Sequence, residues 1–489
     1  MAEEIPDRYE STAEAISPGA IVSAPLARSR EWWKALRDAV RGSSLDYTTA
    51  PIGRAIFMLA VPMMLEMVME SIFAVADVFW VARLGADAVA TVGLTESLLT
   101  LIYTLAIGVS IGAMALVARR VGEGDTHAAA RAAAQAIVLA VLLSVAIGVV
   151  GVRYAADLLA LMGASPAVIE RGVNFTRIML GGNVVIVLLF VINAIFRGAG
   201  DAAIAMRVLW FGNAINIVLG PMFIFGVGPF PELGVAGAAV ATTIGRGSAV
   251  VYQLLTLTRG GSRIRLKLRQ VAPNLPTMAS LLRLAGPAAF QVMIGMASYV
   301  GLVRIIASFG SAALAGYTIA FRLIIFALLP SWGISNAAAT MVGQNLGARR
   351  PERAERAVWQ SAFYNMLFLG GVSVVFLALA PQIISLFSTD PTVHQYGVSG
   401  LRIISGGFLF YAYGMVLTQS FNGAGDTWTP TVINLFVFWL FELPLAYLLA
   451  TRTALGPLGV FTAMAVSYSS LAVVSALVFR RGRWKQKVV

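Results

Sequence analysis

Twelve long apolar stretches occupy most of this 489-residue sequence. A helix rises about 1.5 Å per residue, so roughly 20 residues cross a hydrocarbon layer about 30 Å thick. Backbone polar groups find no water in lipid, and a helix satisfies them within one segment. The stretches lie near 55–81, 89–118, 130–153, 171–196, 202–228, 234–257, 279–309, 312–343, 357–380, 397–421, 427–450 and 456–479. We therefore predict an all-α integral membrane protein with twelve transmembrane helices.

The composition agrees with a protein whose main solvent is lipid. Charged residues make up 12% of the chain, whereas about 25% is usual in soluble proteins. The chain has no cysteine and only two histidines, His127 and His394. This excludes disulfides, thiolate or imidazole metal clusters and cysteine nucleophiles. We expect no catalytic residue, no cofactor and no metal site.

The net charge of +12 follows the membrane topology. If the N-terminus is cytoplasmic, most of the 36 basic residues fall in cytoplasmic segments. Cytoplasmic loops of membrane proteins carry an excess of Lys and Arg, so the basic charge does not require a nucleic-acid partner. We predict a multi-pass protein of a bacterial inner membrane with both termini in the cytoplasm.

Polar segments divide the chain into regions. Residues 1–50 lack the apolar core of a cleaved signal and are predicted to be a cytoplasmic tail. Within it, 29–42 forms either a short amphipathic helix on the membrane surface or part of a disordered tail. The other predicted regions are an N-lobe of six helices at 51–257, a basic cytoplasmic linker at 258–278, a C-lobe of six helices at 279–480 and a basic tail at 481–489.

An internal repeat relates the two halves. The matching pairs are Pro62 and Pro287, Gly85 and Gly310, Gly122 and Gly347, and Asp201 and Asp426. The separations 287 − 62, 310 − 85, 347 − 122 and 426 − 201 all equal 225. Each half holds an even number of spans, so both halves enter the membrane from the same side. We predict two lobes related by a pseudo-two-fold axis along the membrane normal, with a site at their interface.

The repeated motifs FRGAGD and FNGAGD end at Asp201 and Asp426. Glycine permits a tight turn because it adopts positive φ without steric cost. An aspartate just before a helix commonly accepts hydrogen bonds from the first backbone N–H groups. We therefore predict that each motif forms a cytoplasmic turn whose aspartate caps the next helix.

Three carboxylates lie along the first span, at Glu66, Glu70 and Asp77. At about 100° per residue all three fall on one stripe of a helix. Together they would repel if ionised in a low dielectric, so some should hold protons or a cation should sit among them. The stripe predicts a site where a proton or sodium ion competes with a cationic substrate. The alternative is static pairing with Arg177, Arg246 or Arg322.

Other residues within the spans extend this interpretation. Pro62 removes a backbone hydrogen bond and provides a hinge in the first helix. Glu96 and Arg322 occupy nearly equivalent repeat positions and are predicted to form a salt bridge between the lobes. Glu442 precedes Leu443 and Pro444; because proline lacks an N–H, it frees a carbonyl in the preceding turn. We predict that Glu442 supplies negative charge to the C-lobe.

Over residues 51–480 the sequence resembles the multidrug and toxic compound extrusion (MATE) family. The resemblance rests on LAVPMMLEMVMESIFAVADVFWVARLG in the first span, VARRVGEG and VGQNLGAR, the two GAGD turns, NAINIVLGPMFIFG and LGVAGAAVAT. It implies two six-helix lobes around a V-shaped cavity and alternating access by rocking of the lobes. It also implies export of organic cations against an inward flow of protons or sodium ions, and we expect a monomer.

The resemblance assigns residues as well. Asp77 matches the family's aspartate for cation coupling, and Pro62 matches a proline whose bending accompanies it. Asn213 and Asn216 match asparagines of the fifth helix, and with Gln291, Tyr411 and Glu442 they are predicted to line the substrate cavity. Gly295 and Tyr411 stand where NorM-like members carry acidic residues. This favours the DinF-like pattern over the NorM pattern.

Two other functional classes share some of these features. A flippase for lipid-linked precursors has the same fold but usually has a more basic cavity, whereas the stripe here is acidic. An intramembrane hydrolase needs a nucleophile with a base, and without cysteine or intramembrane histidine only an acidic dyad remains. We therefore predict a secondary transporter rather than an enzyme.

Overall fold

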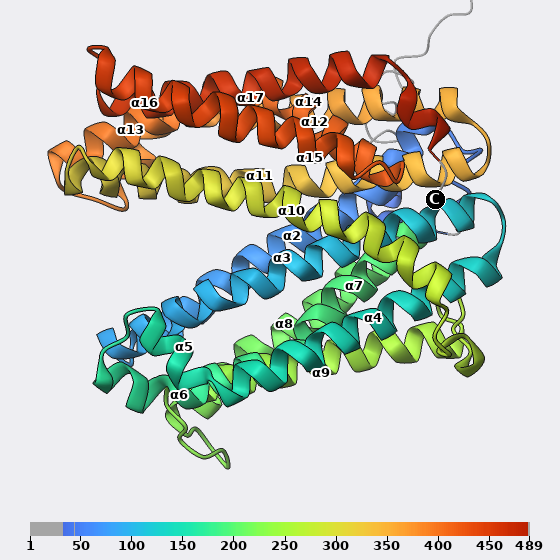
Figure 1. Ribbon diagram of the computed structural model, residues 1–489, viewed down its shortest axis with the longest axis horizontal. Helices are drawn as coiled ribbons and strands as arrows, with labels where there is room; N and C mark the ends of the chain where they lie inside the picture. The colour runs from blue at the N-terminus through green and yellow to red at the C-terminus, as the bar shows by residue number, and fades with distance from the viewer. Residues whose placement is uncertain (1–32, 44, 488–489) are drawn as a thin grey trace, which may run out of the picture.

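The computed structural model describes residues 33–43 and 45–487, which form helices and the turns between them. Their path is drawn in Figure 1. The N-lobe comprises α2 (Ile52–Ala82), α3 (Ala86–Gly122), α4 (Thr126–Arg153), α5 (Ala155–Leu161), α6 (Pro166–Gly181), α7 (Asn183–Ala199), α8 (Ala202–Phe225) and α9 (Val235–Arg259). The C-lobe comprises α10 (Leu275–Ala307), α11 (Ser311–Gly347), α12 (Pro351–Ser385), α13 (Pro391–Gly406), α14 (Phe408–Gly423), α15 (Trp428–Asn434), η2 (Leu435–Glu442), α16 (Leu443–Arg452) and α17 (Pro457–Arg480). Short 3₁₀ turns, η1 (Leu268–Gln270) and η3 (Arg483–Gln486), follow the two lobes.

Several of these helices combine into single apolar spans. Within the described residues, 10 helices are long and apolar enough to cross a membrane, or 11 when α13 and α14 count as one span. In this count α6 and α7 form one span, as do α15, η2 and α16. α9 is a further helix of 25 residues in the N-lobe. The bend of 57° between α13 and α14 falls at Gly406 and Gly407, where a glycine pair commonly permits a kink.

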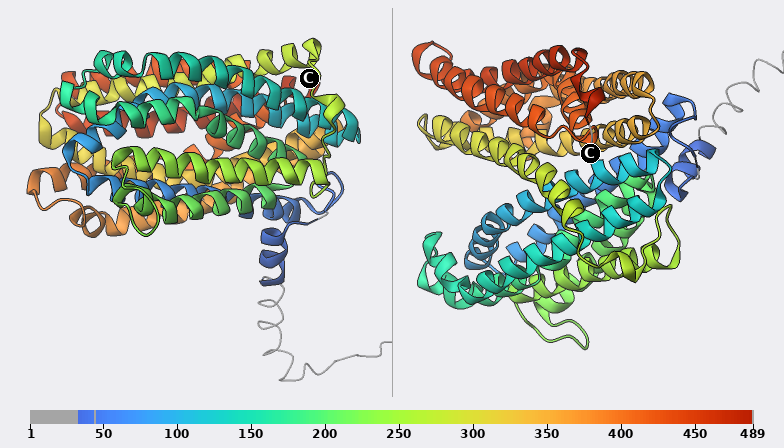
Figure 2. Two further views of the ribbon diagram at one scale, coloured as in Figure 1. Left: turned by 90° about the horizontal axis from the view of Figure 1, so that it is seen from below. Right: turned by 45° about the vertical axis from the view of Figure 1, so that its right-hand side comes forward.

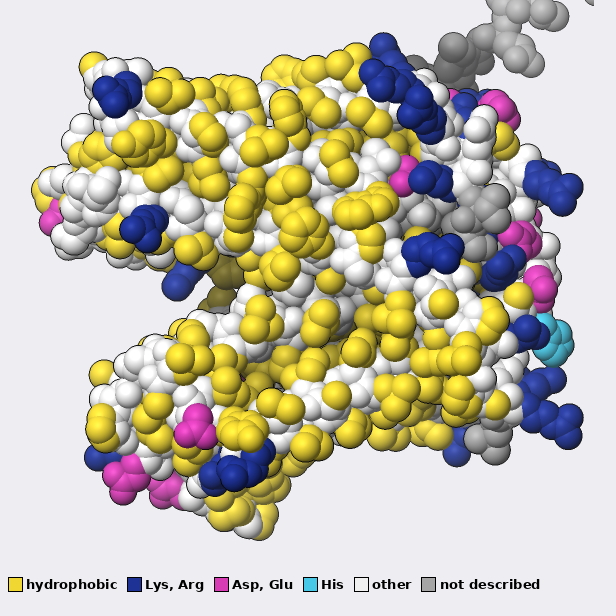
Figure 3. All heavy atoms as spheres, in the orientation of Figure 1, with side chains coloured by type: hydrophobic (Ala, Val, Ile, Leu, Met, Phe, Trp, Pro, Cys, Tyr) yellow, Lys and Arg dark blue, Asp and Glu magenta, His cyan; other side chains and the backbone are white. Residues whose placement is uncertain are grey.

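The two lobes are joined at one end and diverge toward the other, as Figures 1 and 2 show. Each lobe has its own apolar core. Four long helices connect the lobes, because α3 packs against α10 and α11, and α2 packs against α11. In Figure 3 a deep cleft opens between the diverging arms, and most Lys and Arg side chains gather at the joined end. The all-helical, two-lobed architecture predicted from the sequence is confirmed.

Glycine makes the closest contact between the lobes possible. Where α3 crosses α11, a Cβ atom on Gly122 would lie 2.0 Å from the carbonyl oxygen of Gln344. A Cβ atom on Gly347 would lie 2.2 Å from the carbonyl oxygen of Arg119. Gly122 and Gly347 are repeat partners, so the same residue from each half opens the crossing. The joined end therefore depends on two helix backbones in direct contact.

We expect Gly347→Ala to destabilise the protein by about 1 to 3 kcal/mol, because the methyl group must push two backbones apart. Thermal unfolding in detergent measures this effect. Gly371→Ala is the matched control, because a Cβ atom at Gly371, within α12, would meet nothing within 4 Å.

A second measurement locates the effect. The native chain has no cysteine, so spin labels at His127→Cys and Glu352→Cys report the separation of the exposed first turns of α4 and α12. We expect this separation to increase in Gly347→Ala only. Equal unfolding temperatures and equal label distances in Gly347→Ala and Gly371→Ala would show that the crossing tolerates a side chain.

The GAGD motifs form equivalent turns, but the predicted caps are wrong. Gly200 and Gly425 have φ of 88° and 81°, as the tight turn requires. The Asp201 carboxylate accepts hydrogen bonds from the Ser262 hydroxyl and the Arg263 amide, and it pairs with the Arg263 guanidinium at 3.3 Å.

The carboxylate of Asp426 makes the corresponding contacts in the C-lobe. It pairs with the Lys487 ammonium at 3.1 Å and accepts a hydrogen bond of 2.7 Å from the Thr429 hydroxyl. In both lobes the chain after the last helix folds back and presents a cation to the carboxylate. A charged partner forms a stronger hydrogen bond than a neutral backbone amide, so the aspartates do not cap α8 and α15.

The segments next to the bundle also contact both lobes at the joined end. The Tyr47 hydroxyl donates to the carbonyl of Gly200 in the N-lobe, and the Tyr47 carbonyl accepts from Arg353 in the C-lobe. The carbonyl of Lys487 accepts from Arg119 of α3. Residues 33–41 are helical, whereas 29–32 of the possible amphipathic helix lie outside the described residues.

Candidate functional site

The three carboxylates of α2 occupy different surroundings. α2 is one continuous helix of 31 residues with Pro62 buried inside it. Glu66 is 1% exposed, whereas Glu70 and Asp77 are half-buried. Asp77 lies near the C-terminal end of α2, in the arm of the N-lobe that diverges from the C-lobe (Figure 1). The sequence spacing places the three carboxylates on one stripe of the helix, but each of them has different neighbours in the structure.

Glu66 forms a buried ion pair with an arginine of its own lobe. Its Oε1 atom accepts hydrogen bonds from Arg197 at 2.7 Å and from the Asn193 amide at 3.0 Å. The Asn193 side chain in turn accepts from Gln253 of α9 at 2.6 Å. Static pairing was the alternative interpretation, but the predicted partners Arg177, Arg246 and Arg322 are wrong for Glu66. The partner is the arginine of the FRGAGD motif.

Glu70 faces a second arginine, on α9. Its Oε1 atom lies 3.5 Å from Arg246, and its Oε2 atom accepts from the Asn213 amide at 3.2 Å. Arg246 also donates to the Tyr103 hydroxyl at 3.2 Å, and its guanidinium lies 5.4 Å from the centroid of the Phe73 ring. The Arg246 side chain is almost fully buried. Arg246 is therefore a fixed positive charge inside the N-lobe.

Asp77 and Glu96 share the electrostatic field of this arginine. The charges of Glu96 and Arg246 both act on Asp77, and Arg246 also acts on Glu96. We call Glu70, Asp77, Glu96 and Arg246 the N-lobe acid cluster. It contains three carboxyl groups and one guanidinium, so full ionisation would leave an excess of negative charge in a low-dielectric region. The cluster can balance that charge by holding protons or by admitting a cation.

The residues predicted to line one substrate cavity lie in two different lobes. Asn213 and Asn216 are on α8 in the N-lobe, where Asn216 donates to the Thr242 hydroxyl at 2.8 Å. Gln291, Tyr411 and Glu442 line a pocket in the C-lobe. The lining of this pocket includes the three C-lobe residues and does not include Asn213 or Asn216. That the five residues line one substrate cavity between the lobes stays a prediction.

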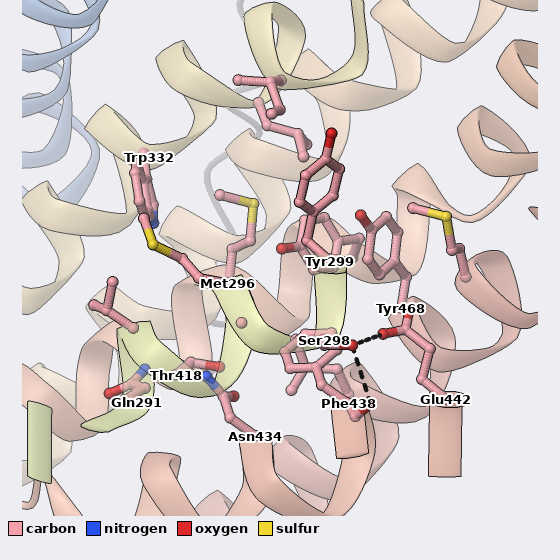
Figure 4. A pocket seen from close by; sticks show the side chains of 18 of the residues that line it. Gln291, Met296, Ser298, Tyr299, Trp332, Thr418, Asn434, Phe438, Glu442 and Tyr468 are labelled. Carbon is pink, nitrogen blue, oxygen red and sulfur yellow. Dashed lines mark hydrogen bonds between the residues drawn. The ribbon is translucent and has the colours of Figure 1, made fainter. Parts of the chain in front are cut away.

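The C-lobe pocket has a volume of about 390 Å³. It is lined by α10, α11, α14, α15, η2 and α17, together with Ile107 and Ile111 of α3. Figure 4 shows aromatic and methionine side chains converging on it with a few polar groups. Tyr411 and Tyr468 stack at 3.9 Å between ring centroids. Mostly apolar pockets with few polar groups are typical of small-molecule sites.

Glu442 is the acidic group of this pocket and is 2% exposed. Its Oε2 atom lies 2.9 Å from the Ser298 hydroxyl, which also lies 3.1 Å from the carbonyl oxygen of Phe438 (Figure 4). Pro444 is predicted to free a carbonyl in the preceding turn, and the structure has a π-helix over Leu435–Glu442, just before this proline. Such π-helical turns are frequent at functional sites. The sequence contained no signal for Ser298, because its role depends on α10 packing against η2.

The MatE family profile matches this chain twice, over residues 62–222 and 287–448. The chain belongs to the MatE family. The two matches begin at the repeat partners Pro62 and Pro287, so the family profile independently confirms the internal duplication. As a MATE transporter, the protein is a multi-pass membrane protein and not an enzyme.

Relatives of this MATE transporter cover nearly the whole chain. It is 26% identical to the probable multidrug resistance protein YoeA of Bacillus subtilis, over 90% of this chain and 95% of that protein. It is 27% identical to a FAD transporter of Shewanella oneidensis, over 82% of this chain and 88% of that protein. A solved structure of a multidrug resistance MATE family transporter in an outward-facing conformation superposes with a TM-score of 0.85, at 26% identity over 91% of this chain and 99% of that chain.

The salt bridge predicted between Glu96 and Arg322 of this MATE transporter is wrong. Among the ion pairs of the described residues, none joins Glu96 to Arg322. Equivalent repeat positions lie on opposite arms, and the arms diverge where α3 and α11 begin (Figure 1). Glu96 instead lies in the field of Arg246 within its own lobe.

Proposed function

We propose that this MATE transporter exports organic cations in exchange for protons by alternating access, as a monomer of a bacterial inner membrane. The N-lobe acid cluster carries the proposal. A cluster with surplus carboxyl groups gains protons on the side where they are abundant and releases them on the other side. The coupling residues follow the DinF-like pattern, with Asp77 in the first span as the central group.

The shape of the molecule supports a two-state cycle. The lobes are joined at the basic end and the cleft opens at the other end (Figure 3). Because basic residues favour the cytoplasmic side, we assign the joined end to the cytoplasm, together with both termini. The described conformation then exposes its cleft to the outside, and rocking of the lobes about the glycine crossing exposes it to the inside.

Protons are favoured over sodium ions by the composition of the cluster. Arg246 already pairs with Glu70 and lies near Asp77, so it takes up a carboxylate oxygen that a sodium ion would need as a ligand. Among the described residues, no group of three or more acidic or histidine side chains is arranged to hold a metal ion. Sodium coupling is the alternative, and the transport experiment below distinguishes it from proton coupling.

The cargo is inferred from the C-lobe pocket. Glu442 is the charged residue of its lining, which includes no Lys or Arg among the described residues. Aromatic rings such as Tyr411 and Trp332 can stack on planar cations. A dinucleotide such as FAD carries phosphates that require basic groups or helix N-termini, and the lipid-linked substrates of a flippase also carry a pyrophosphate. The pocket therefore favours cationic cargo over both.

Transport in proteoliposomes tests the proposal. With an imposed pH gradient and no sodium, we expect accumulation of tetraphenylphosphonium coupled to counterflow of protons, and no movement of FAD. The same vesicles without a pH gradient, but with a sodium gradient, are the control. Uptake that requires sodium and ignores the pH gradient would replace the proton with sodium, and uptake of FAD alone would overturn the cationic cargo.

A further inference from the structure

Ser298 has more hydrogen-bond acceptors than it has hydrogens. Its hydroxyl lies 2.9 Å from Oε2 of Glu442 and 3.1 Å from the carbonyl oxygen of Phe438. A hydroxyl donates one hydrogen and accepts through its lone pairs. A backbone carbonyl can only accept, and so can an ionised carboxylate. With an ionised Glu442, one hydrogen would have to be shared between the two acceptors in a bifurcated bond. If Glu442 bears a proton and donates it to Ser298, each of the two contacts has a hydrogen of its own.

Glu442 also lacks a compensating charge. It belongs to no ion pair among the described residues, in contrast to Glu66, which has Arg197. The titratable groups that share its electrostatic surroundings are Tyr317 of α11, Tyr411 of α14 and Tyr468 of α17. From α10, the neutral Ser298 contacts Glu442 at 2.9 Å. An isolated carboxylate in an apolar environment is costly, whereas a carboxylic acid with an acceptor is not.

The pocket places a cargo molecule next to this acid. Glu442 and Ser298 both contribute to its lining, together with Tyr299, Tyr411 and Tyr468 (Figure 4). A cation that enters the pocket would supply the charge that Glu442 lacks. The four-residue spacing of Phe438 and Glu442 within η2 lets one hydroxyl reach both groups. Ser298 can then turn its hydrogen from the Phe438 carbonyl to the carboxylate without moving α10.

We propose that Glu442 carries a proton in this conformation and that a cationic cargo molecule displaces it from the C-lobe pocket. The acid form donates to Ser298, and Ser298 donates to Phe438. When the cation binds, the O–H bond of Glu442 breaks, the proton leaves to water, and Ser298 donates to the carboxylate. One positive charge enters as one leaves, so the charge of the pocket is unchanged. This inference rests on the proposed function and adds a proton site in the lobe opposite to Asp77.

Proton release on binding tests the displacement directly. Titration calorimetry of the full-length protein with tetraphenylphosphonium, in two buffers of different ionisation enthalpy, counts the protons released. We expect Glu442→Gln to release about one proton fewer per bound cation than the parent, as proton linkage requires. Glu352→Gln, at an exposed glutamate in the first turn of α12 and outside the pocket, is the matched control and should release as many protons as the parent.

A spectroscopic measurement keeps the test independent of affinity. The infrared C=O stretch of a protonated carboxylic acid should decrease when tetraphenylphosphonium binds to the parent, and this change should be absent in Glu442→Gln. Glutamine retains the size of glutamate and a hydrogen bond to Ser298, and thermal unfolding verifies that the variant is folded. A carboxylic acid band that persists on binding, or equal proton release in parent and Glu442→Gln, would overturn the proposal.

The proposed antiport and the proposed proton site at Glu442 are tested by different experiments. If proteoliposomes show proton-coupled export but Glu442→Gln releases as many protons as the parent, only the role of Glu442 is wrong. If proton displacement occurs in detergent but no gradient drives transport in proteoliposomes, the proposed antiport is wrong and the C-lobe proton site remains.

Discussion

Asp77→Asn should abolish export driven by a pH gradient while tetraphenylphosphonium still binds. Asparagine has the size of aspartate but cannot exchange a proton, and in the described residues Asp77 has no hydrogen-bond or ion-pair partner that the change would break. The charges of Glu96 and Arg246 act on Asp77, so its proton alters the balance of the whole N-lobe acid cluster. Without that exchange, the two states of the cycle are no longer linked to the gradient.

The measurement is proton flux and cargo flux in the same proteoliposomes. We expect both coupled fluxes to fall to the level of protein-free vesicles, whereas binding in detergent changes little because the C-lobe pocket is intact. Asp87→Asn is the matched control. Asp87 is also an aspartate of the N-lobe, but it is exposed and pairs with Arg171 at the surface. Coupled proton movement that persists in Asp77→Asn would rule out Asp77 as the coupling residue.

The sequence predicted the architecture well because its signals are local or repeated. Each apolar span is readable from composition along one segment. The duplication is readable from matched residues such as Gly122 and Gly347, and these residues meet at the crossing of α3 and α11. The positive φ of Gly200 and Gly425 followed from the motif alone. None of these features requires knowledge of which helix faces meet.

Predictions that depended on pairing between helices were less successful. A charge within a membrane span is costly, so the sequence marked Glu66, Glu70 and Asp77 as candidates for a paired or a functional role. The identity of each partner depends on helix rotation and packing, which one sequence does not contain. Arg197 pairs with Glu66 because α7 presents both Asn193 and Arg197, one turn apart, to α2.

The caps at the GAGD turns failed for a related reason. An N-cap is a local prediction and holds when no stronger partner is present. Here Arg263 and Lys487, distant in sequence from the aspartates they contact, return to the two turns. The same limit applies to the C-lobe pocket. Tyr411 and Glu442 were singled out from the sequence, whereas Ser298 and the π-helical turn emerge only when α10 and η2 are seen together.

Glu66→Gln should destabilise the fold and leave proton coupling intact. Removing one partner of a buried ion pair costs about 3 to 5 kcal/mol, because the other charge stays buried without compensation. Arg197 would be that charge, since it pairs with Glu66 at 2.7 Å. The effect reaches the other lobe, because the backbone carbonyl of Arg197 accepts a hydrogen bond from Thr340 of α11. The variant should therefore unfold at a clearly lower temperature than the parent.

A double-mutant cycle isolates the pair. Arg197→Gln alone should cost a similar amount, and Glu66→Gln combined with Arg197→Gln should cost less than the sum of the two, because no buried charge is left unpaired. Transport per folded molecule should retain its dependence on the pH gradient in Glu66→Gln. A variant that unfolds at the temperature of the parent but no longer couples cargo to protons would place Glu66 in the coupling site, with Asp77. A variant that unfolds at a lower temperature but still couples cargo to protons would show that Glu66 stabilises the N-lobe, whereas other carboxylates of α2 exchange protons.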